Sequence, residues 1–290
     1  MIHGREQQMI LVTGATGNVG GAVLEQLVEA GYRVRVLARD PAKLGDLGGK
    51  VEVVKGDLSR PETLEAAFAG VDRAFIVCTG SDLATLAGNA AEAARKAGVK
   101  HLVLLSSASV GSGYDIQIGR WHRDAEARVK ASGLAWTMVQ PGAFASNTLQ
   151  WVGSIKAQGA VFQATGDGKT APIDPRDIAA VAVKALTTPG HEGKAYVLTG
   201  PELLSTSEQV AKISAAIGRP LRFVEVTEAQ AREGLEKAGL PEVFISALLE
   251  ASAMIKAGHG KDVSPTVEQL LGRKARTYDD WLQSNAKAFR

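Results

Sequence analysis

A glycine-rich segment near the start of the chain has the spacing of a phosphate-binding loop. The apolar run Met9–Thr13 leads into glycines at positions 14, 17 and 20, and a helical pattern follows at Val19–Ala30. Glycines permit a tight turn and close backbone approach to a pyrophosphate, and a helix N-terminus offers N–H groups and a positive dipole end. The pattern predicts a dinucleotide site. The residues expected at its phosphates are Gly14, Thr16, Gly17, Asn18, Val19 and Gly20.

The elements that would position this loop alternate regularly up to about residue 140. Nearly continuous runs of Val, Ile and Leu predict strands covered on both faces at Met9–Thr13, Arg33–Ala38, Val51–Lys55, Arg73–Val77, His101–Ser106 and Ala135–Val139. Helical patterns lie between them at Val19–Ala30, Pro61–Phe68 and Leu83–Ala97, and glycines follow helices at positions 31, 70, 98 and 133. This alternation predicts an α/β fold, a Rossmann doubly wound parallel sheet.

The second half of the chain has a different rhythm. A helix is expected at Ile178–Leu186 with Asp174 or Asp177 as its cap, then a strand at Ala195–Thr199, a helix at Ser205–Ile217, a strand at Leu221–Val226 and a mostly helical tail. Ser205 and Glu208 have the spacing of a capping box. We expect a Rossmann domain over residues 9–150 and a smaller α+β substrate-binding lobe over 151–290, with parts of 160–200 returning to the Rossmann sheet.

Composition excludes several classes of function. The 290 residues carry a net charge of +2 without a basic run, and aromatic residues make up 5%, so we expect no nucleic-acid partner. The single cysteine, Cys78, excludes a cysteine-based zinc cluster and favours packing over thiol chemistry, and the histidines lack metal-ligand spacing, so we expect no metal. No apolar stretch approaches the ~18 residues that span a bilayer. Residues 1–8 lack the apolar core of a signal peptide, which predicts a soluble, cytoplasmic protein.

The end of the second predicted strand indicates which nicotinamide cofactor binds. NAD-dependent enzymes generally present an acid there to the ribose 2′-hydroxyl. Here the strand ends at Ala38 and Arg39 follows, whose guanidinium suits a 2′-phosphate; Lys43 adds a second positive charge. We therefore expect NADP(H) to be preferred over NAD(H). The alternative is that Arg39 is a solvated loop residue and Asp40 binds the ribose.

Several motifs together resemble the NmrA-like group of atypical, extended short-chain dehydrogenase/reductases, nearest to its NADPH-dependent quinone oxidoreductases and triphenylmethane-type reductases. The resemblance spans nearly the whole chain. It rests on the segments 12–20, 56–58, 104–107, 133–137, 140–144, 174–179, 198–202 and 271–273. It implies that the cofactor is also bordered by Asp57, Leu58, Thr79, Gly80, Ser106, Ser107, Pro141 and Gly142. For Asp57, capping of the helix that begins near Pro61 is the alternative.

The catalytic dyad of the wider superfamily, Tyr-x-x-x-Lys, is absent. When Glu126 is aligned with the acid that usually follows the lysine by four residues, His122 falls at the lysine position and Ile118 at the tyrosine position. Tyr114 could substitute only if its loop folds back. His122, with an ordinary pKa near 6.5, is the best candidate acid, although packing beside Trp121 is an equal alternative.

Without this dyad the usual proton donor is missing, which favours a hydride acceptor that stabilises its own developing negative charge by delocalisation. We expect an NADPH-dependent reductase that transfers hydride to a quinone, dye or other conjugated electrophile; the alternative is a non-catalytic, redox-sensing NADP(H)-binding regulator of the NmrA type. Apolar helices of the second half leave room for a homodimer surface. The expected pocket residues, which could instead pack the two lobes together, are Tyr114, Trp121, Phe144, Asn147 and Trp151.

Overall fold

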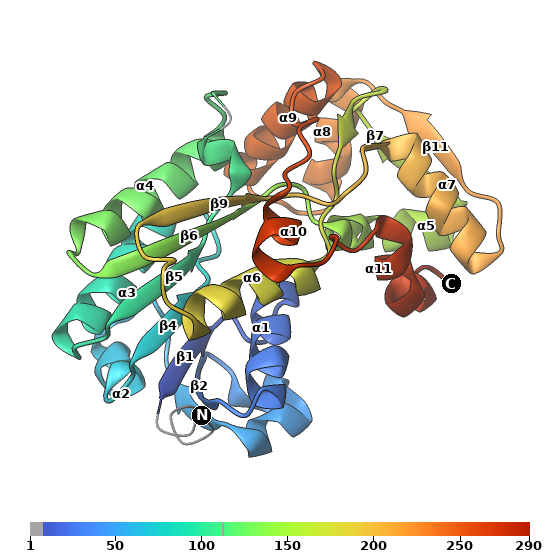
Figure 1. Ribbon diagram of the computed structural model, residues 1–290. Coiled ribbons are helices and arrows are strands. Elements are labelled where there is room, and N and C mark those ends of the chain that lie inside the picture. The colour runs from blue at the N-terminus through green and yellow to red at the C-terminus, as the bar shows by residue number, and fades with distance from the viewer. Residues whose placement is uncertain (1–7, 112) are drawn as a thin grey trace. The chain divides into compact units, whose positions relative to one another are not determined.

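The computed structural model describes residues 8–111 and 113–290 (Figure 1). The first seven residues, over which no signal peptide is expected, lie outside this description. Contacts divide the chain into two compact units that interleave along the sequence. Unit 1 contains the residues up to Val110, Arg120–Pro141 and Pro175–Val197. Unit 2 contains Gly111–Gly119, Gly142–Asp174 and Leu198–Arg290.

Unit 1 is built on a seven-stranded parallel sheet with the strand order β3-β2-β1-β4-β5-β6-β9. The first strand, β1, has all five residues buried, as a strand covered on both faces requires. The strands are β1 (Met9–Thr13), β2 (Arg33–Ala38), β3 (Glu52–Lys55), β4 (Arg73–Ile76), β5 (His101–Leu105), β6 (Ala135–Pro141) and β9 (Lys194–Leu198).

Helices cover both faces of this sheet (Figure 1). One face packs against α1 (Asn18–Glu29) and α6 (Pro175–Thr187), which also contact each other. The other face forms a continuous core with α2 (Leu64–Phe68), α3 (Leu83–Lys96) and α4 (Gln117–Ala131). Short 3₁₀ helices complete the unit: η1 (Pro41–Lys50), η2 (Pro61–Thr63) and η3 (Ala108–Val110). The predicted Rossmann fold is confirmed.

The six predicted strands of the first half all form, with ends that shift by no more than two residues. The glycines predicted to end helices at positions 31, 70, 98 and 133 all have positive φ angles, between +69° and +79°. Glycine adopts this left-handed conformation without steric cost, which explains why the helices stop there. The strand expected at residues 195–199 forms one residue earlier, as β9 at the edge of the main sheet.

Unit 2 has two small sheets and its own core. β7 (Ala160–Gln163) pairs in parallel with β11 (Arg222–Glu225), and β8 (Lys169–Thr170) pairs antiparallel with β10 (Leu204–Ser205). The short strands β7, β8 and β10 were not predicted from the sequence. The helices are η4 (Ala145–Trp151), α5 (Val152–Gln158), α7 (Thr206–Ile217), α8 (Glu228–Lys237), α9 (Glu242–Lys256), α10 (Thr266–Leu271), α11 (Tyr278–Asn285) and η5 (Ala286–Phe289).

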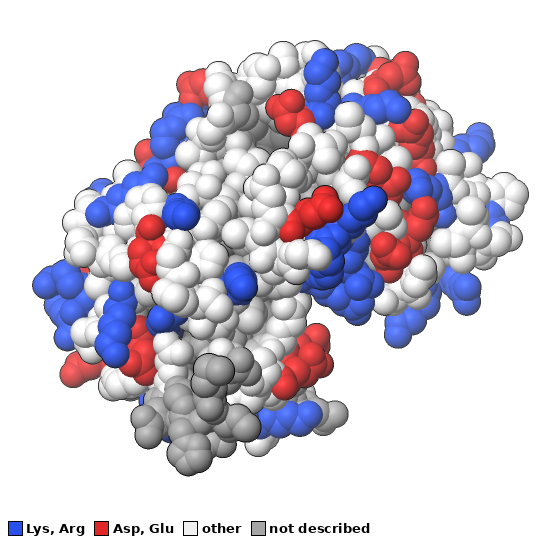
Figure 2. All heavy atoms as spheres, in the orientation of Figure 1, with Lys and Arg blue, Asp and Glu red and all other residues white. Residues whose placement is uncertain are grey.

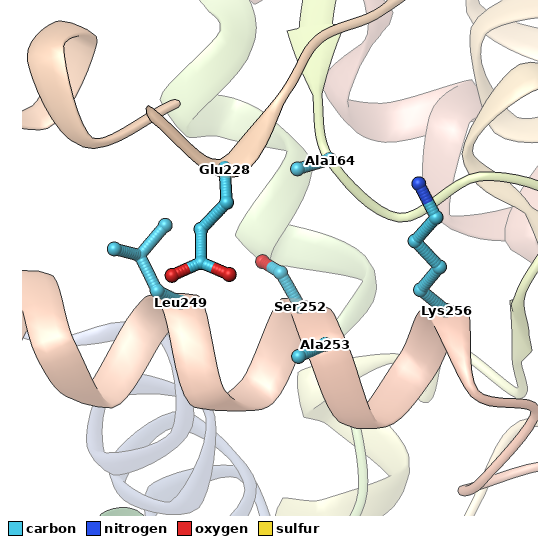
Figure 3. A pocket seen from close by; sticks show the side chains of 6 residues that line it. All are labelled: Ala164, Glu228, Leu249, Ser252, Ala253 and Lys256. Carbon is cyan, nitrogen blue, oxygen red and sulfur yellow. The ribbon is translucent and has the colours of Figure 1, made fainter. Parts of the chain in front are cut away.

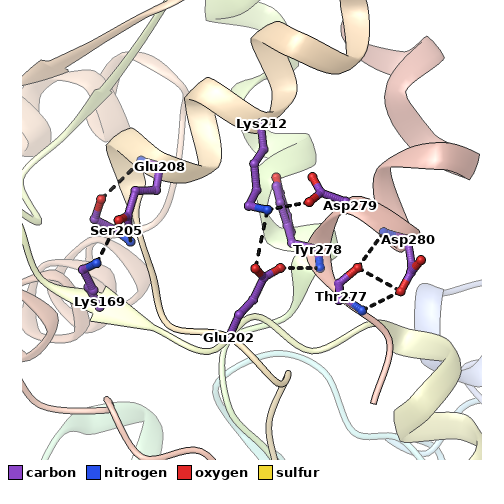
Figure 4. Close-up of polar contacts among 9 residues, drawn as sticks. All are labelled: Lys169, Glu202, Ser205, Glu208, Lys212, Thr277, Tyr278, Asp279 and Asp280. Carbon is purple, nitrogen blue, oxygen red and sulfur yellow. Dashed lines mark hydrogen bonds and ion pairs between the residues drawn. The ribbon is translucent and has the colours of Figure 1, made fainter. Parts of the chain in front are cut away.

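Polar contacts attach the C-terminal helix of unit 2 to α7 (Figure 4). Nζ of Lys212 on α7 lies 2.5 Å from Oδ2 of Asp279 and 3.4 Å from Oε2 of Glu202. The other Glu202 oxygen accepts a 2.9 Å hydrogen bond from the backbone N–H of Tyr278. The predicted capping box of α7 is confirmed, because Ser205 and Glu208 exchange the two reciprocal hydrogen bonds.

Candidate functional site

The glycine loop forms a cradle in which neighbouring atoms leave no room for a side chain at positions 14 and 20. Gly14 has φ = +65°, and the amide of Gly17 donates a 2.9 Å hydrogen bond back to its carbonyl oxygen. A Cβ atom on Gly20 would lie 2.2 Å from that same oxygen, well inside van der Waals contact. Gly14 and Gly20 are therefore fixed as glycines by geometry, and the turn between them is tight.

The N-terminus of α1 follows this cradle directly. Gly17 is the N-cap residue, no side chain caps the helix, and the first turn contains no acidic residue. Thr16, Gly17 and Asn18 are exposed, whereas Val19 and Gly20 are buried in the helix. Backbone N–H groups and the positive end of the helix dipole at an exposed loop fit the pyrophosphate of a dinucleotide. The residues present fit a nicotinamide dinucleotide.

The ends of β1 and β4 are fastened together beneath the loop. The hydroxyl oxygen of Thr13 accepts a 2.7 Å hydrogen bond from the amide of Val77. A Cβ atom on Gly14 would lie 2.9 Å from Cβ of Val77, so the segments that follow β1 and β4 are already in contact at this point. Thr79 and Gly80, which follow β4, are exposed, and Gly80 has φ = +107°.

The end of β2 presents Arg39 to solvent and uses Asp40 locally. Ala38 is buried and Arg39 is exposed. Oδ1 of Asp40 accepts a hydrogen bond from the amide of Ala42 at 3.3 Å, which caps η1. Lys43 is exposed on the same 3₁₀ helix. The alternative ribose ligand, Asp40, therefore already has a structural partner.

Asp57 and Leu58 follow β3 and differ in what they offer a ligand. Oδ1 of Asp57 accepts hydrogen bonds from the amide and the hydroxyl of Ser59, both at 2.9 Å. These bonds, with the Ser59 amide first, outweigh burial and hold the Asp57 pKa below its ordinary value. Asp57 thus stabilises a turn rather than capping the helix at Pro61, whose N-cap residue is Arg60. Leu58 is 8% exposed and packs in the core of unit 1.

The two serines after β5 point to different environments. Ser106 is 3% exposed and its hydroxyl donates a 2.6 Å hydrogen bond to Oε1 of Glu126. Ser107 is partly exposed and its hydroxyl lies 2.8 Å from that of Ser109. At the end of β6, Pro141 is buried, and the Gly142 amide donates to the carbonyl of Leu198 in unit 2. Of the two serines, the Ser107 side chain is the one left for a ligand.

His122 lies on α4 in a position that keeps its ring neutral. Burial lowers its pKa to about 4, and the nearby Glu126 carboxylate opposes this only in part. Ile118 stands in the first turn of α4, where a tyrosine would serve as proton donor. With this pKa the imidazole is uncharged at neutral pH.

Tyr114 lies three residues before the first residue of α4, so the helix does not reach it. Its ring packs against the His259 ring, with 3.9 Å between ring centroids and 34° between planes. The loop around it is tied to α9, because Glu250 accepts a 2.6 Å hydrogen bond from the amide of Gln117.

The aromatic residues expected to line the acceptor pocket fall into different settings. Trp121 is partly buried against the core of unit 1. In unit 2, Phe144 forms a bridge with Ile173 and is partly exposed, and Asn147 is exposed. Trp151 is 8% exposed and belongs to the core of unit 2. Its packing leaves little of the ring to a ligand.

A cavity of about 130 Å³ lies in unit 2, against α9 (Figure 3). Glu228 points into it from the start of α8, and Ser252 faces it from α9. Its lining is Ala164, Glu228, Leu249, Ser252, Ala253 and Lys256, and none of the predicted site residues is among them.

Other features of the described residues bear on the predicted classes of function. Basic and acidic side chains are interspersed over the face seen in Figure 2. In the ranges 8–111 and 113–290, no helix is both long and apolar enough to cross a membrane, and no three His, Cys, Asp or Glu side chains cluster as a metal site. Burial raises the pKa of Cys78 to about 12, so the thiol stays protonated and packs against the core.

Known proteins resemble this chain over almost its whole length. The model of an NAD(P)H-binding family matches residues 14–189. An NAD(P)H azoreductase of Xenophilus azovorans is 42% identical over 97% of this chain and 99% of its own. A (4-alkanoyl-5-oxo-2,5-dihydrofuran-3-yl)methyl phosphate reductase of Streptomyces griseus is 44% identical over the same shares.

A solved structure agrees with these relatives. The NADPH complex of an NADPH-dependent quinone oxidoreductase from Escherichia coli superposes with a TM-score of 0.84 at 26% identity, over 95% of this chain and 99% of that one. The chain belongs to the NAD(P)H-binding family, and its predicted place among the NmrA-like proteins is confirmed.

Proposed function

We propose that this protein is an NADPH-dependent reductase that passes hydride to a quinone, a dye or another conjugated electrophile. One observation carries the proposal: unit 1 pairs a complete dinucleotide cradle with a helix α4 that holds no proton-donating dyad. The relatives named as an azoreductase, a dihydrofuranone phosphate reductase and a quinone oxidoreductase support the same class of reaction.

The division of labour in the reaction follows from this arrangement. When bound, the reduced nicotinamide supplies the hydride. The chain holds the pyrophosphate at Gly14, Gly17 and Gly20 and at the first turn of α1. Reduction of a simple ketone needs a proton donor held at the ketone oxygen, and oxidation of a secondary alcohol needs a proton acceptor there. The pKa of His122, about 4, keeps its ring neutral at pH 7, so in this proposal the acceptor stabilises the developing charge by delocalisation.

The preference for NADPH over NADH is part of the proposal. Arg39 is exposed at the end of β2 and Lys43 on the following 3₁₀ helix, where they would bind the 2′-phosphate. Asp40 is engaged in capping η1, which supports the arginine as the ribose-side ligand.

On the acceptor side we propose contacts from Tyr114, Trp121, Phe144 and Asn147, each of which has exposed surface. Trp151 has a packing role in this proposal because it belongs to the core of unit 2. Along the cofactor we propose Asp57, Thr79, Gly80, Ser107 and Gly142, with backbone contacts only from Leu58, Ser106 and Pro141, whose side chains are buried.

The experiment that tests the function is a survey of acceptors. NADPH consumption is followed by absorbance with purified protein and a panel of quinones, azo dyes, triphenylmethane dyes and simple ketones. We expect turnover with conjugated acceptors and none with simple ketones. Absence of turnover with every acceptor, together with tight binding that distinguishes NADP from NADPH, would instead support the regulator.

We also propose a cytoplasmic location and a homodimer. Light scattering at micromolar concentration measures the oligomeric state directly. A mass near 60 kDa, about twice the 30.4 kDa of one chain, supports the dimer, and a mass near that of one chain contradicts it.

A further inference from the structure

A buried carboxylate on α4 is held by three donors. Glu126 is 2% exposed. Its Oε1 accepts hydrogen bonds from the Ser106 hydroxyl and from Nε2 of Gln140, both at 2.6 Å. Its Oε2 lies 3.0 Å from Nζ of Lys130, one turn later on the same helix.

Such a carboxylate is costly to bury unless its oxygens are satisfied. Here the two short bonds to Oε1 and the ion pair at Oε2 satisfy it, and bonds to a charged acceptor are the strong ones. A buried, fully satisfied polar network fixes its members in one geometry. The network therefore makes the positions of Ser106 and Gln140 rigid.

Ser106 and Gln140 lie at the carboxyl ends of two neighbouring strands. Ser106 directly follows β5, and Gln140 is the penultimate residue of β6. The amide of Ser106 also donates a 2.7 Å hydrogen bond to the Val139 carbonyl, which extends the β5–β6 pairing past the end of β5. Ligands of an open α/β sheet bind at the carboxyl ends of its strands, so the network lies at the cofactor edge of unit 1.

The residues beside the network are the ones offered to the cofactor. The Ser106 side chain is drawn inward to Glu126, whereas the neighbouring Ser107 keeps exposed surface and its hydroxyl bonds to the hydroxyl and the amide of Ser109. β1 and β2 carry the cradle and Arg39, which would bind the pyrophosphate and the adenosine ribose. By the order of the strands, β5 and β6 lie on the opposite side of β1 from β2.

We propose that Glu126 is a positioning residue for the nicotinamide half of the cofactor. It locks the ends of β5 and β6 to α4 and thereby sets the place of Ser107. The adenosine half, bound at β1 and β2, does not depend on it. This inference rests on the proposed dinucleotide function, and the following experiment separates the two.

The test compares two ligands that differ only by the nicotinamide ring, since 2′-phospho-ADP-ribose keeps both riboses and the pyrophosphate. Dissociation constants of NADPH and of 2′-phospho-ADP-ribose are measured by calorimetry for the wild type, Glu126→Gln and Ser106→Ala. The matched control is Glu92→Gln, which breaks an exposed i,i+4 pair with Lys96 on α3. We expect Glu126→Gln to weaken NADPH about five-fold or more, or ~1 kcal/mol by the standard conversion, with 2′-phospho-ADP-ribose changed less than about two-fold.

A second readout covers the position of the ring itself. The deuterium isotope effect on hydride transfer should rise in Glu126→Gln and Ser106→Ala, because a misplaced nicotinamide slows that step, and the double variant should be no worse than the more severe single one. Equal loss of both ligands, or a lower melting temperature with unchanged affinities and isotope effect, would overturn the proposal. If the wild type binds NADPH but reduces no acceptor, the reductase function fails while the binding comparison still decides the role of Glu126.

Discussion

Arg39 and Asp57 follow neighbouring strands and act on each other electrostatically. The pKa of the Asp57 carboxyl lies below its ordinary value, chiefly because of the hydrogen bond from the Ser59 amide. Burial opposes this shift, and the positive charge of Arg39 adds to it. The two side chains therefore lie at one edge of the sheet, the edge that receives the adenosine end of a dinucleotide in this fold.

Replacement of Arg39 by aspartate should change the choice of cofactor. The variant loses a charge-assisted contact worth ~1.5–3 kcal/mol and places a carboxylate near the 2′-phosphate, so NADPH affinity should fall at least about ten-fold. NADH affinity should change little. Titration by fluorescence measures both, with Arg33→Asp at the opposite end of β2 as control. Equal losses for the two cofactors would contradict the assignment.

A methyl group on Gly20 should disrupt the cradle. Its Cβ would lie 2.2 Å from the Gly14 carbonyl oxygen, so the loop or the first turn of α1 must move. We expect Gly20→Ala to weaken NADPH about ten-fold or more. Gly88→Ala on α3 is the matched control, because its nearest neighbour is 3.9 Å away; there alanine should raise stability by up to about 1 kcal/mol. Unchanged NADPH binding by Gly20→Ala would place the cofactor elsewhere.

The activity should not depend on a histidine titration near pH 6.5. With its pKa at about 4, the His122 imidazole stays neutral from pH 5.5 to pH 8. The pH profile of kcat should therefore be flat in that range, and His122→Asn should lower kcat less than the ~100-fold typical of a lost general acid. An inflection near pH 6.5 in the wild type that disappears in the variant would show that His122 is the acid after all.

Two buried histidines in unit 1 should make stability depend on pH. His101 and His191 are 2% and 7% exposed; Nε2 of His101 lies 2.9 Å from the Thr137 hydroxyl, whose proton is donated to the His191 carbonyl oxygen. Burial lowers the pKa values of both histidines. The Arg73 charge on β4 lowers them further, and the Glu192 carboxylate opposes the shift. For His191, Lys184 and Lys194 also lower the pKa.

Below pH 6.5 the two histidines therefore bind more protons in the unfolded chain than in the folded chain. The contribution of the two neutral histidines to the free energy of unfolding is complete above their pKa in the unfolded chain, near 6.5. It is lost as the pH falls from there toward their lowered pKa values in the folded chain. Urea unfolding should give a smaller free energy at pH 5.5 than at pH 7.5, and His101→Gln should reduce that difference. The same pH dependence in His101→Gln as in the wild type would rule out a contribution from His101.

The first half of the fold was predictable because its signals are local. β1 lies fully inside the protein, and its unbroken run of apolar residues predicted a strand covered on both faces. Gly31 and Gly98 ended helices where the sequence indicated. The strands β8 and β10 were missed because they contain two residues each, too few for any hydrophobic period to appear.

The candidate site was only partly predictable, for a physical reason. The spacing of Gly14, Gly17 and Gly20 is a contiguous pattern, so its geometry could be anticipated. Ser106 and Ser107 are identical in type and adjacent in sequence, yet Ser106 is buried and Ser107 partly exposed. The buried hydroxyl bonds to Glu126, which lies twenty residues away in the sequence. The lowered pKa of His122 likewise comes from burial, which no residue type encodes.

The interleaving of the two units has a consequence for synthesis and for dissection of the protein. Because unit 1 takes its last helix and strand from Pro175–Val197, the nascent chain cannot complete the seven-stranded sheet until about two-thirds of it has been made. Until then α1 and the face of the sheet beneath it lack α6, their largest packing partner. Contacts between parts so distant in sequence slow folding. A fragment that ends at residue 150 would expose that apolar surface permanently, so limited proteolysis should release no stable N-terminal fragment.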